Sequence, residues 1–294
     1  MPEGMQKFYK GKSIFITGGS GFMGKVLLEK FLYSCSDIKE IFLLMRPKRG
    51  KTGAERVQDF ALIPVNFSFF SFHFSSIKCK YLFSLLLLFC LKVFHRIVKE
   101  KPEMFNKIIP VFGDITSVRL GLNDEQYQRV ISSSNIVFHM AASLKLEATL
   151  KPNVEMNLTG TKHVIDVCKQ MPNLLATVHL STAFCNCDQQ ILQEKVYEWP
   201  QKPLDLIRCA EWMTEEAMDN MGSKLIAPHP NTYTYTKRLA ELLVRDEFPN
   251  IPICIVRPSI GERFCGLPPI NDVYFLWFQS RQLGKSPCPD GLTH

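Results

Sequence analysis

The sequence predicts an α/β protein built on a Rossmann-type, doubly wound parallel sheet, and three observations carry this prediction. Short β-branched and apolar runs alternate with longer amphipathic stretches along the chain, as is typical of βαβ units. A glycine-rich turn, TGGSGFMG, spans Thr17 to Gly24 directly after the first apolar run. A Tyr-x-x-x-Lys pair, Tyr233 and Lys237, lies far downstream. The 294 residues, 46% of them hydrophobic, suffice for one such domain with a substantial core.

Six apolar runs are expected to form the strands of the sheet. They are residues 13–17, 41–45, 107–112, 135–139, 176–180 and 253–256. Amphipathic spacing predicts helices in the intervening sequence, over residues 23–33, 157–169 and 234–245. Ligands of such sheets bind at the carboxyl ends of the strands, so the residues that follow each run are the candidate site.

Composition argues against several other classes of protein. The formal charge of +7 is modest, and no run of Lys and Arg interleaved with aromatic residues suggests a nucleic-acid partner. The ten cysteines are scattered without a C-x-x-C pair, which favours reduced thiols in a cytosol-facing protein and gives no metal site. The polar start of the chain contains no apolar segment of the kind found in secretory signals.

Two regions depart from the alternating pattern. Residues 61–92 consist largely of Phe, Ser and Leu with neither helical nor strand periodicity, and we interpret them as an insertion foreign to the fold, with translation of a retained intron as the hypothesis. The apolar run within them is shorter than the ~20 residues that span a bilayer. Residues 261–294 also lose the pattern and form an atypical tail. The predicted dinucleotide-binding domain is therefore 10–260, interrupted at about 61–92.

The glycine turn has the sequence context of a dinucleotide-binding site. Gly18 permits the tight turn, Gly21 lets the backbone approach the phosphates, and Gly24 allows close helix packing. The helix that opens here supplies N–H donors and the positive end of its dipole to a pyrophosphate. The predicted cofactor contacts in this segment are Thr17, Gly18, Gly21, Phe22, Met23 and Gly24. The alternative is a purely structural strand-to-helix turn.

The residues after the second strand favour NADPH over NADH. An NAD site usually has Asp or Glu about 20 residues after the glycines, whereas this chain has Arg46. A guanidinium suits a 2′-phosphate and can stack on adenine, although a solvated basic loop is the competing interpretation. Asp114, after the third strand, is expected near the adenine amino group, and Ala141, after the fourth, is expected to make room for the cofactor.

Tyr233 and Lys237 are one helical turn apart, as proton donation to a carbonyl requires. An ammonium there would stabilise the phenolate and could also bind the nicotinamide ribose. Either Ser181 or Thr182, after the fifth strand, could hydrogen-bond the carbonyl oxygen. Asn157 is either a plain N-cap or a residue that holds water near Lys237.

Three further side chains have ordinary structural interpretations. Cys185 has no activating base beside it in the sequence, so a small core residue is favoured over a nucleophile. His139 and His179 lie inside apolar strands and are expected to be packed, neutral rings.

Together, several segments resemble the fatty acyl-CoA reductases, and most of all the insect-type enzymes, which are extended short-chain dehydrogenases. The resemblance covers about residues 10–60 and 93–260. It rests on TGGSGFMG, LLMRPKRG, FHMAASLKLEATL, VHLSTAFCN, NTYTYTKRLAE and IVRPSI.

The resemblance implies NADPH-dependent reduction of a long-chain acyl-CoA to a primary alcohol through an aldehyde. Tyr233 would donate the proton with Lys237 as its partner, Thr182 or Ser181 would polarise the carbonyl, and the glycines with Arg46 would hold NADPH. It also implies association with endoplasmic reticulum or peroxisomal membranes. Family members continue into a substrate-binding region and a helical C-terminal domain, so the substrate region is expected to be incomplete. The alternatives are another extended short-chain dehydrogenase, acting on a sugar nucleotide or a sterol, and a catalytically silent dinucleotide-binding fragment.

Overall fold

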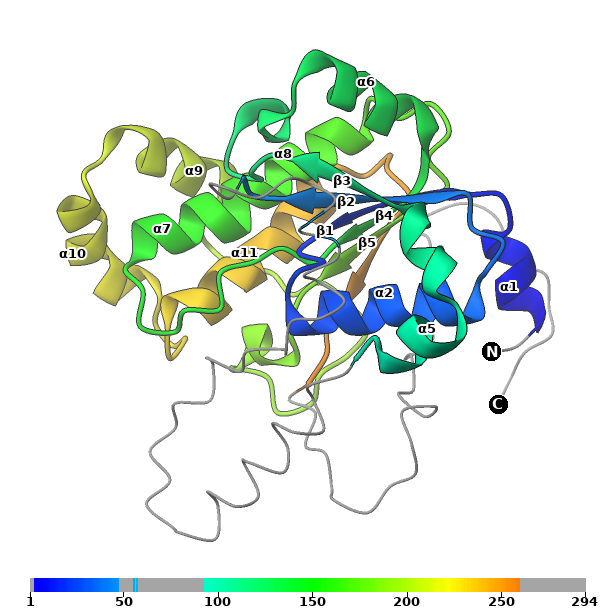
Figure 1. Ribbon diagram of the computed structural model, residues 1–294. Coiled ribbons are helices and arrows are strands. Elements are labelled where there is room, and N and C mark those ends of the chain that lie inside the picture. The colour runs from blue at the N-terminus through cyan, green and yellow to red at the C-terminus, as the bar shows by residue number, and fades with distance from the viewer. Residues whose placement is uncertain (1–2, 48–54, 56, 58–92, 260–294) are drawn as a thin grey trace, which may run out of the picture.

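The computed structural model describes residues 3–47, 55, 57 and 93–259 (Figure 1). The proposed insertion at 61–92 and the tail at 261–294 lie outside these residues. Within the part of the chain that the structure describes, no helix combines the length and apolarity needed to cross a membrane.

The core of the molecule is a six-stranded sheet in which every neighbouring pair of strands is parallel. The strand order is β3-β2-β1-β4-β5-β6, the order of dinucleotide-binding α/β folds. The bounds are β1 Ser13–Thr17, β2 Glu40–Met45, β3 Ile108–Phe112, β4 Ser134–His139, β5 Ala176–Leu180 and β6 Ile253–Val256. The predicted fold class and all six predicted strands are confirmed, within one residue at each end.

Helices cover both faces of this sheet (Figure 1). Alternate residues of β1 serve the two layers: Ile14 and Ile16 belong to one apolar cluster, and Phe15 belongs to another on the opposite face. The first layer contains α2 (Phe22–Ser34), α5 (His95–Glu100) and the 3-10 turn η1 (Pro102–Lys107), with α1 (Glu3–Tyr9) packed at its end. Since both faces are covered, the strands are mostly apolar, although polar residues such as Thr17, His139 and His179 are buried among them.

The second layer contains α11 (Thr232–Glu247), the longest helix among the residues that the structure describes. It also includes η2 (Val118–Gly121), α6 (Asp124–Ser133), α7 (Leu150–Val154), η3 (Glu155–Thr159) and α8 (Gly160–Cys168). Between β5 and α11 the chain forms the short η4 (Ala183–Asn186), α9 (Pro203–Trp212) and α10 (Glu215–Leu225). The sequence analysis did not predict α6, α9 or α10.

The helix expected over residues 157–169 begins earlier than its apolar spacing indicates. Helical structure runs from Leu150 to Cys168, and its middle segment, η3, is a π-helix. Pro152 lies in the first turn, where its missing N–H breaks no intrahelical hydrogen bond. The interpretation of Asn157 as an N-cap is therefore wrong, because this residue lies inside the π segment.

Candidate active site

Apart from Tyr233 and Lys237, which lie on α11, the predicted site residues lie at or after the carboxyl ends of strands, and these ends form a single edge of the sheet. Backbone hydrogen bonds continue past the strands here, from Gly113 N to Met45 O (3.0 Å) and from Met140 N to Thr17 O (3.1 Å). Ser181 N likewise donates to Val256 O (2.6 Å). The first residue of each of these loops is thus hydrogen-bonded to the last residue of the neighbouring strand.

The glycine turn is packed as closely as its sequence predicts. Gly18 has a φ of +74°, and a Cβ on it would come within 2.4 Å of Ala141 N. A Cβ on Gly24 would lie 2.4 Å from Gly18 O. Gly24 therefore lets α2 approach the turn itself, and any side chain at either position would collide with backbone.

The start of α2 suits an anionic group. Its N-cap is Gly21, which offers no side chain to cap the helix, and the first turn contains no acidic residue. Phe22 and Met23, the first two helical residues, are 41% and 44% exposed. Backbone N–H groups at an uncapped helix start, with the positive end of the helix dipole, are what a pyrophosphate requires, so the residues present fit a dinucleotide.

Arg46 and Asp114, each predicted to contact the adenosine half of the cofactor, form an ion pair. Arg46 Nε lies 2.7 Å from Asp114 Oδ2. The other carboxylate oxygen of Asp114 accepts from Thr116 N and Thr116 Oγ1, both at 2.9 Å. The ion pair joins the ends of β2 and β3 and orients the guanidinium, which sequence reasoning did not foresee.

Tyr233 lies beside Thr182 near the start of α11. Asn231 caps this helix by accepting from Thr234 N at 2.9 Å. Burial raises the pKa of the Tyr233 phenol to about 12, although a hydrogen bond with Thr182 lowers it. The phenol is therefore protonated at neutral pH and can act as an acid.

The two candidate hydroxyls after β5 have different surroundings. Ser181 Oγ lies 3.6 Å from the sulfur of Cys185, whereas the Thr182 hydroxyl bonds to Tyr233. Thr182 Oγ1 also accepts from Phe184 N at 3.3 Å. Its hydrogen therefore remains available to the phenol or to a substrate oxygen.

Lys237 is held by β5. It is 2% exposed, and its Nζ donates to Leu180 O at 2.6 Å and lies 3.4 Å from His179 Nε2. Burial lowers the pKa of Lys237 to about 8, and Cys185 and Glu241 oppose the shift. The expected stabilisation of the phenolate by this ammonium is not a cause of the Tyr233 pKa, which burial dominates.

Asn157 connects the loop after β4 to the Tyr–Lys helix. Its Oδ1 accepts from Ser143 N (2.7 Å), while its Nδ2 donates to Ser143 O (3.2 Å) and Thr236 Oγ1 (3.1 Å). Asn157 is only 1% exposed. Its side chain therefore fixes the position of α11 relative to β4.

Sequence reasoning missed a buried acid one turn beyond Lys237. Glu241 is 1% exposed and accepts from Arg257 Nε at 2.8 Å and from the Cys185 thiol at 3.2 Å. Burial raises the pKa of Cys185 to about 12, so the thiol is inert, as a packed core cysteine should be. The spacing Tyr233–Lys237–Glu241 places all three on one helix face and could have revealed this acid.

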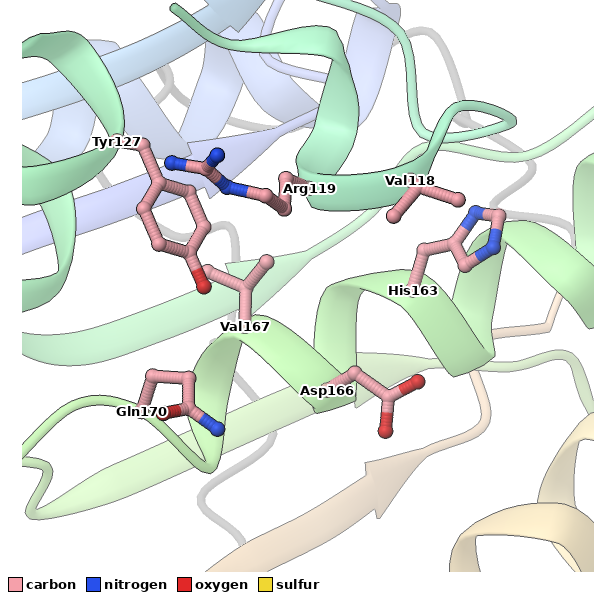
Figure 2. A pocket seen from close by; sticks show the side chains of 7 residues that line it. All are labelled: Val118, Arg119, Tyr127, His163, Asp166, Val167 and Gln170. Carbon is pink, nitrogen blue, oxygen red and sulfur yellow. The ribbon is translucent and has the colours of Figure 1, made fainter. Parts of the chain in front are cut away.

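A shallow pocket of about 200 Å³ lies elsewhere in the second layer (Figure 2). Arg119 and Tyr127 contribute to its wall with His163 and Asp166 of α8. It contains none of the predicted cofactor or catalytic residues.

The strand order, the glycine turn and the Tyr–Lys helix at one sheet edge define the class as an extended short-chain dehydrogenase/reductase. Residues 16–287 match the family described as "Male sterility protein", an NAD-binding domain. The chain therefore belongs to this family, and its cofactor is a nicotinamide dinucleotide.

Curated relatives are similar in sequence. The chain is 35% identical over 254 residues to fatty acyl-CoA reductase 1 of Gallus gallus, and 36% identical over 253 residues to fatty acyl-CoA reductase 2 of Mus musculus and of Homo sapiens. Each alignment covers 86% of this chain and 44% of the relative, so the chain spans less than half the length of these relatives.

Solved structures show the same fold at low sequence identity. One is the terminal R domain of the myxalamid PKS-NRPS pathway, with a TM-score of 0.52 and 19% identity, covering 85% of this chain and 49% of that chain. Another is the reductase domain of a non-ribosomal peptide synthetase from Mycobacterium tuberculosis, with a TM-score of 0.51 and 14% identity, covering 88% of this chain and 52% of that chain.

Proposed function

We propose that this protein reduces long-chain fatty acyl-CoA thioesters to primary alcohols with NADPH, through an aldehyde. The observation that carries the proposal is the hydrogen bond between Tyr233 and Thr182, at the end of the same strand whose Leu180 O accepts from the buried Lys237. The sequence similarity to fatty acyl-CoA reductases supports the choice of substrate. The same similarity leads us to propose association with the cytosolic face of an endoplasmic reticulum or peroxisomal membrane.

The reaction consists of two reductions. In the first, the thioester carbon accepts a hydride and its oxygen a proton, and loss of the coenzyme A thiol gives the aldehyde. In the second, the aldehyde carbon accepts a hydride and its oxygen a proton, which gives the alcohol. NADPH, when bound, supplies one hydride to each step.

The protein's own residues handle the oxygen of the substrate. The Tyr233 phenol is protonated and donates its proton to the oxygen. Thr182 is the second donor, because its hydrogen is available to that oxygen, and it stabilises the negative charge that develops there. Lys237, held through two of its hydrogens, directs its positive charge at the same region and favours the phenolate left behind.

The preference for NADPH is assigned to Arg46. Its guanidinium follows β2, is oriented by Asp114 and would bind a 2′-phosphate on the adenosine ribose. Carboxylates that bind a 2′-hydroxyl in NAD enzymes have no counterpart at position 46.

The direct test measures NADPH consumption by the purified chain with palmitoyl-CoA, with a UDP-sugar and with a 3-ketosteroid, and identifies the products by mass spectrometry. We expect consumption with palmitoyl-CoA only, and hexadecanol as the product. Turnover with a sugar nucleotide or a sterol would assign another member of the class. Thermal stabilisation by NADPH without turnover of any of them would identify a binding module instead.

A further inference from the structure

His179 is a buried polar ring on β5, in contact with the ammonium of Lys237. The ring is 0% exposed, and its Nε2 lies 3.4 Å from Lys237 Nζ. The ammonium also donates a hydrogen bond to the backbone oxygen of Leu180, the next residue of the same strand. Two successive residues of β5 thus hold two of the three ammonium hydrogens.

The protons on this ring can be assigned from its neighbour. An ammonium only donates, so His179 Nε2 must accept, and the ring proton must be on Nδ1. Among the residues that the structure describes, Nδ1 has no hydrogen-bond partner. A buried N–H without a partner is unfavourable, and an apolar residue at this position would avoid it.

His139, the register partner of His179 on β4, carries its proton on the other nitrogen. Thr161 Oγ1 gives its hydrogen to Asn157 O (2.6 Å), so it must accept from His139 Nε2–H (3.0 Å). Thr17 Oγ1 accepts from Ala141 N (3.3 Å) and donates to His139 Nδ1 (2.8 Å). The centroids of the two rings are 5.2 Å apart. The two histidines therefore have opposite tautomers, and Lys237 determines only the tautomer of His179.

We propose that His179 is a positioning residue for Lys237. The neutral His179 ring accepts one ammonium hydrogen and Leu180 O accepts a second, so the third hydrogen is left for a ligand at the sheet edge. The inference rests on the proposed function, because it concerns the same Tyr–Lys site. An acceptor at Nε2 favours the charged amine, and without it the pKa of Lys237 would fall further.

Several other groups act on Lys237 and would remain in any variant of His179. Cys185 of η4 and Glu241 of α11 raise the pKa of Lys237, while burial lowers it. Arg257, after β6, is paired with Glu241. His139 of β4 is neutral, and Tyr233 stays protonated because their pKa values lie far from neutrality. A shift on substitution of His179 alone therefore reports the lost acceptor.

The first experiment reads the tautomers directly in the full chain. Long-range ¹H–¹⁵N correlation of ¹⁵N-histidine protein at neutral pH distinguishes Nδ1–H from Nε2–H rings, and spectra of the His139→Gln and His179→Gln variants assign the two signals. We expect the Nδ1–H form for His179 and the Nε2–H form for His139. An Nε2–H form or a charged ring at His179 would overturn the proposal, whether or not the protein reduces acyl-CoA.

The second experiment compares two substitutions that differ in where they place an oxygen. His179→Gln extends its amide oxygen as far as Nε2, whereas the oxygen of His179→Asn reaches only the position of Nδ1. We expect the Asn variant to lose activity at a pH about one unit lower than wild type. Its turnover should then be about twofold slower than wild type at pH 7 and about tenfold slower at pH 9, above the pKa of Lys237 in both proteins. The Gln variant should stay closer to wild type, with the thermal midpoints of the two variants alike.

Equal pH profiles for the Asn and Gln variants would contradict the positioning role. The pH dependence of NADPH affinity, followed by the fluorescence of the bound cofactor, provides the same comparison without acyl-CoA. Absence of wild-type turnover would thus count against the proposed function, while the tautomer and affinity measurements would still decide the role of His179.

Discussion

The same physical cause acts on the two central side chains in opposite directions. Burial disfavours a charge, so it raises the pKa of the Tyr233 phenol to about 12 and lowers that of the Lys237 ammonium to about 8. Below pH 8 the phenol is neutral and the amine is charged. The proposed reaction requires this state, with a protonated phenol as the acid and a charged amine near it.

The pH dependence of the proposed reaction should follow Lys237. We expect kcat/KM with palmitoyl-CoA to fall as the pH rises above about 8, because the amine then loses its charge while Tyr233 stays protonated. Lys237→Arg cannot lose its proton in this range, so its lower activity should show no such decline. An unchanged decline in the Arg variant would assign the titration to another group.

Cofactor preference should follow Arg46. Hydrogen bonds to charged groups contribute about 1.5–3 kcal/mol, so Arg46→Gln should raise the Kd for NADPH about tenfold or more and leave that for NADH within about twofold. Asp114→Asn removes the partner of Arg46 but keeps the cation, and is the matched control. Equal weakening of both cofactors in Arg46→Gln would indicate a role in local structure instead of selectivity.

At the scale of elements, the π segment η3 connects the loop after β4 to helix α11 through hydrogen bonds. It brings Asn157 to face both the loop after β4 and helix α11, and its side chain makes three hydrogen bonds there. The first residue of α11 is also held by a buried hydrogen bond, because Asn153 Nδ2 of α7 donates to Thr232 Oγ1 at 2.6 Å. Tyr233 is the next residue, so its position depends on the contacts that α7 and η3 make with α11.

Removing the Asn157 side chain should therefore affect both stability and catalysis. We expect Asn157→Ala to lower the free energy of unfolding by about 2–4 kcal/mol, because buried partners lose their hydrogen bonds, and to lower kcat more than it raises KM. Chemical denaturation and steady-state kinetics measure the two effects. Asn123→Ala, at the exposed N-cap of α6, should cost about 1 kcal/mol with no change in kcat.

The strands were predictable from sequence, whereas the start of the helix that begins at Leu150 was not. Each strand is a short, mostly apolar run, and this property is local in sequence. The beginning of the helix at Leu150 depends on tertiary contacts: Leu150 N donates to Asp219 of α10 at 3.1 Å. The π-helical register likewise depends on Ser143 and Thr236, which are distant from Asn157 in sequence.

At the scale of the whole molecule, the sheet encloses two neutral histidines at the centre of the fold. Burial lowers the pKa of His139 to about 3 and that of His179 well below its usual value. The unfolded chain binds protons at these rings below about pH 6.5, and the folded chain does not. Folding is therefore opposed increasingly as the pH falls from about 6.5 towards 3.

Acid should destabilise the protein through these two rings. At about pH 5 the His139 ring should lower the free energy of unfolding by about 2 kcal/mol relative to neutral pH, since one pKa unit corresponds to about 1.4 kcal/mol. His179 should act in the same direction. Denaturation curves at several pH values measure this slope. His139→Asn keeps an acceptor for Thr17 but does not titrate, so it should flatten the curve, and an unchanged slope would remove His139 from the account.

The motifs predicted which residues gather at the sheet edge, because the order of parallel strands brings their carboxyl ends together. They did not predict how those residues contact one another. These contacts depend on the approach of elements that are separate in sequence. They are the Arg46–Asp114 ion pair, the hydrogen bond from Lys237 to Leu180 O of β5, and the Glu241–Arg257 ion pair. The hydrogen bond between Tyr233 and Thr182, on which the proposal of Thr182 over Ser181 rests, was likewise not predicted.

The most direct test of the account compares wild type with Tyr233→Phe. The variant removes one hydroxyl, and the measurements are palmitoyl-CoA-dependent NADPH consumption and the Kd for NADPH. We predict that turnover falls by about 10²–10⁴-fold, the usual contribution of a general acid, while the Kd changes by less than about twofold. Turnover within tenfold of wild type, or a loss of NADPH binding as large as the loss of turnover, would contradict the proposal that Tyr233 donates the proton.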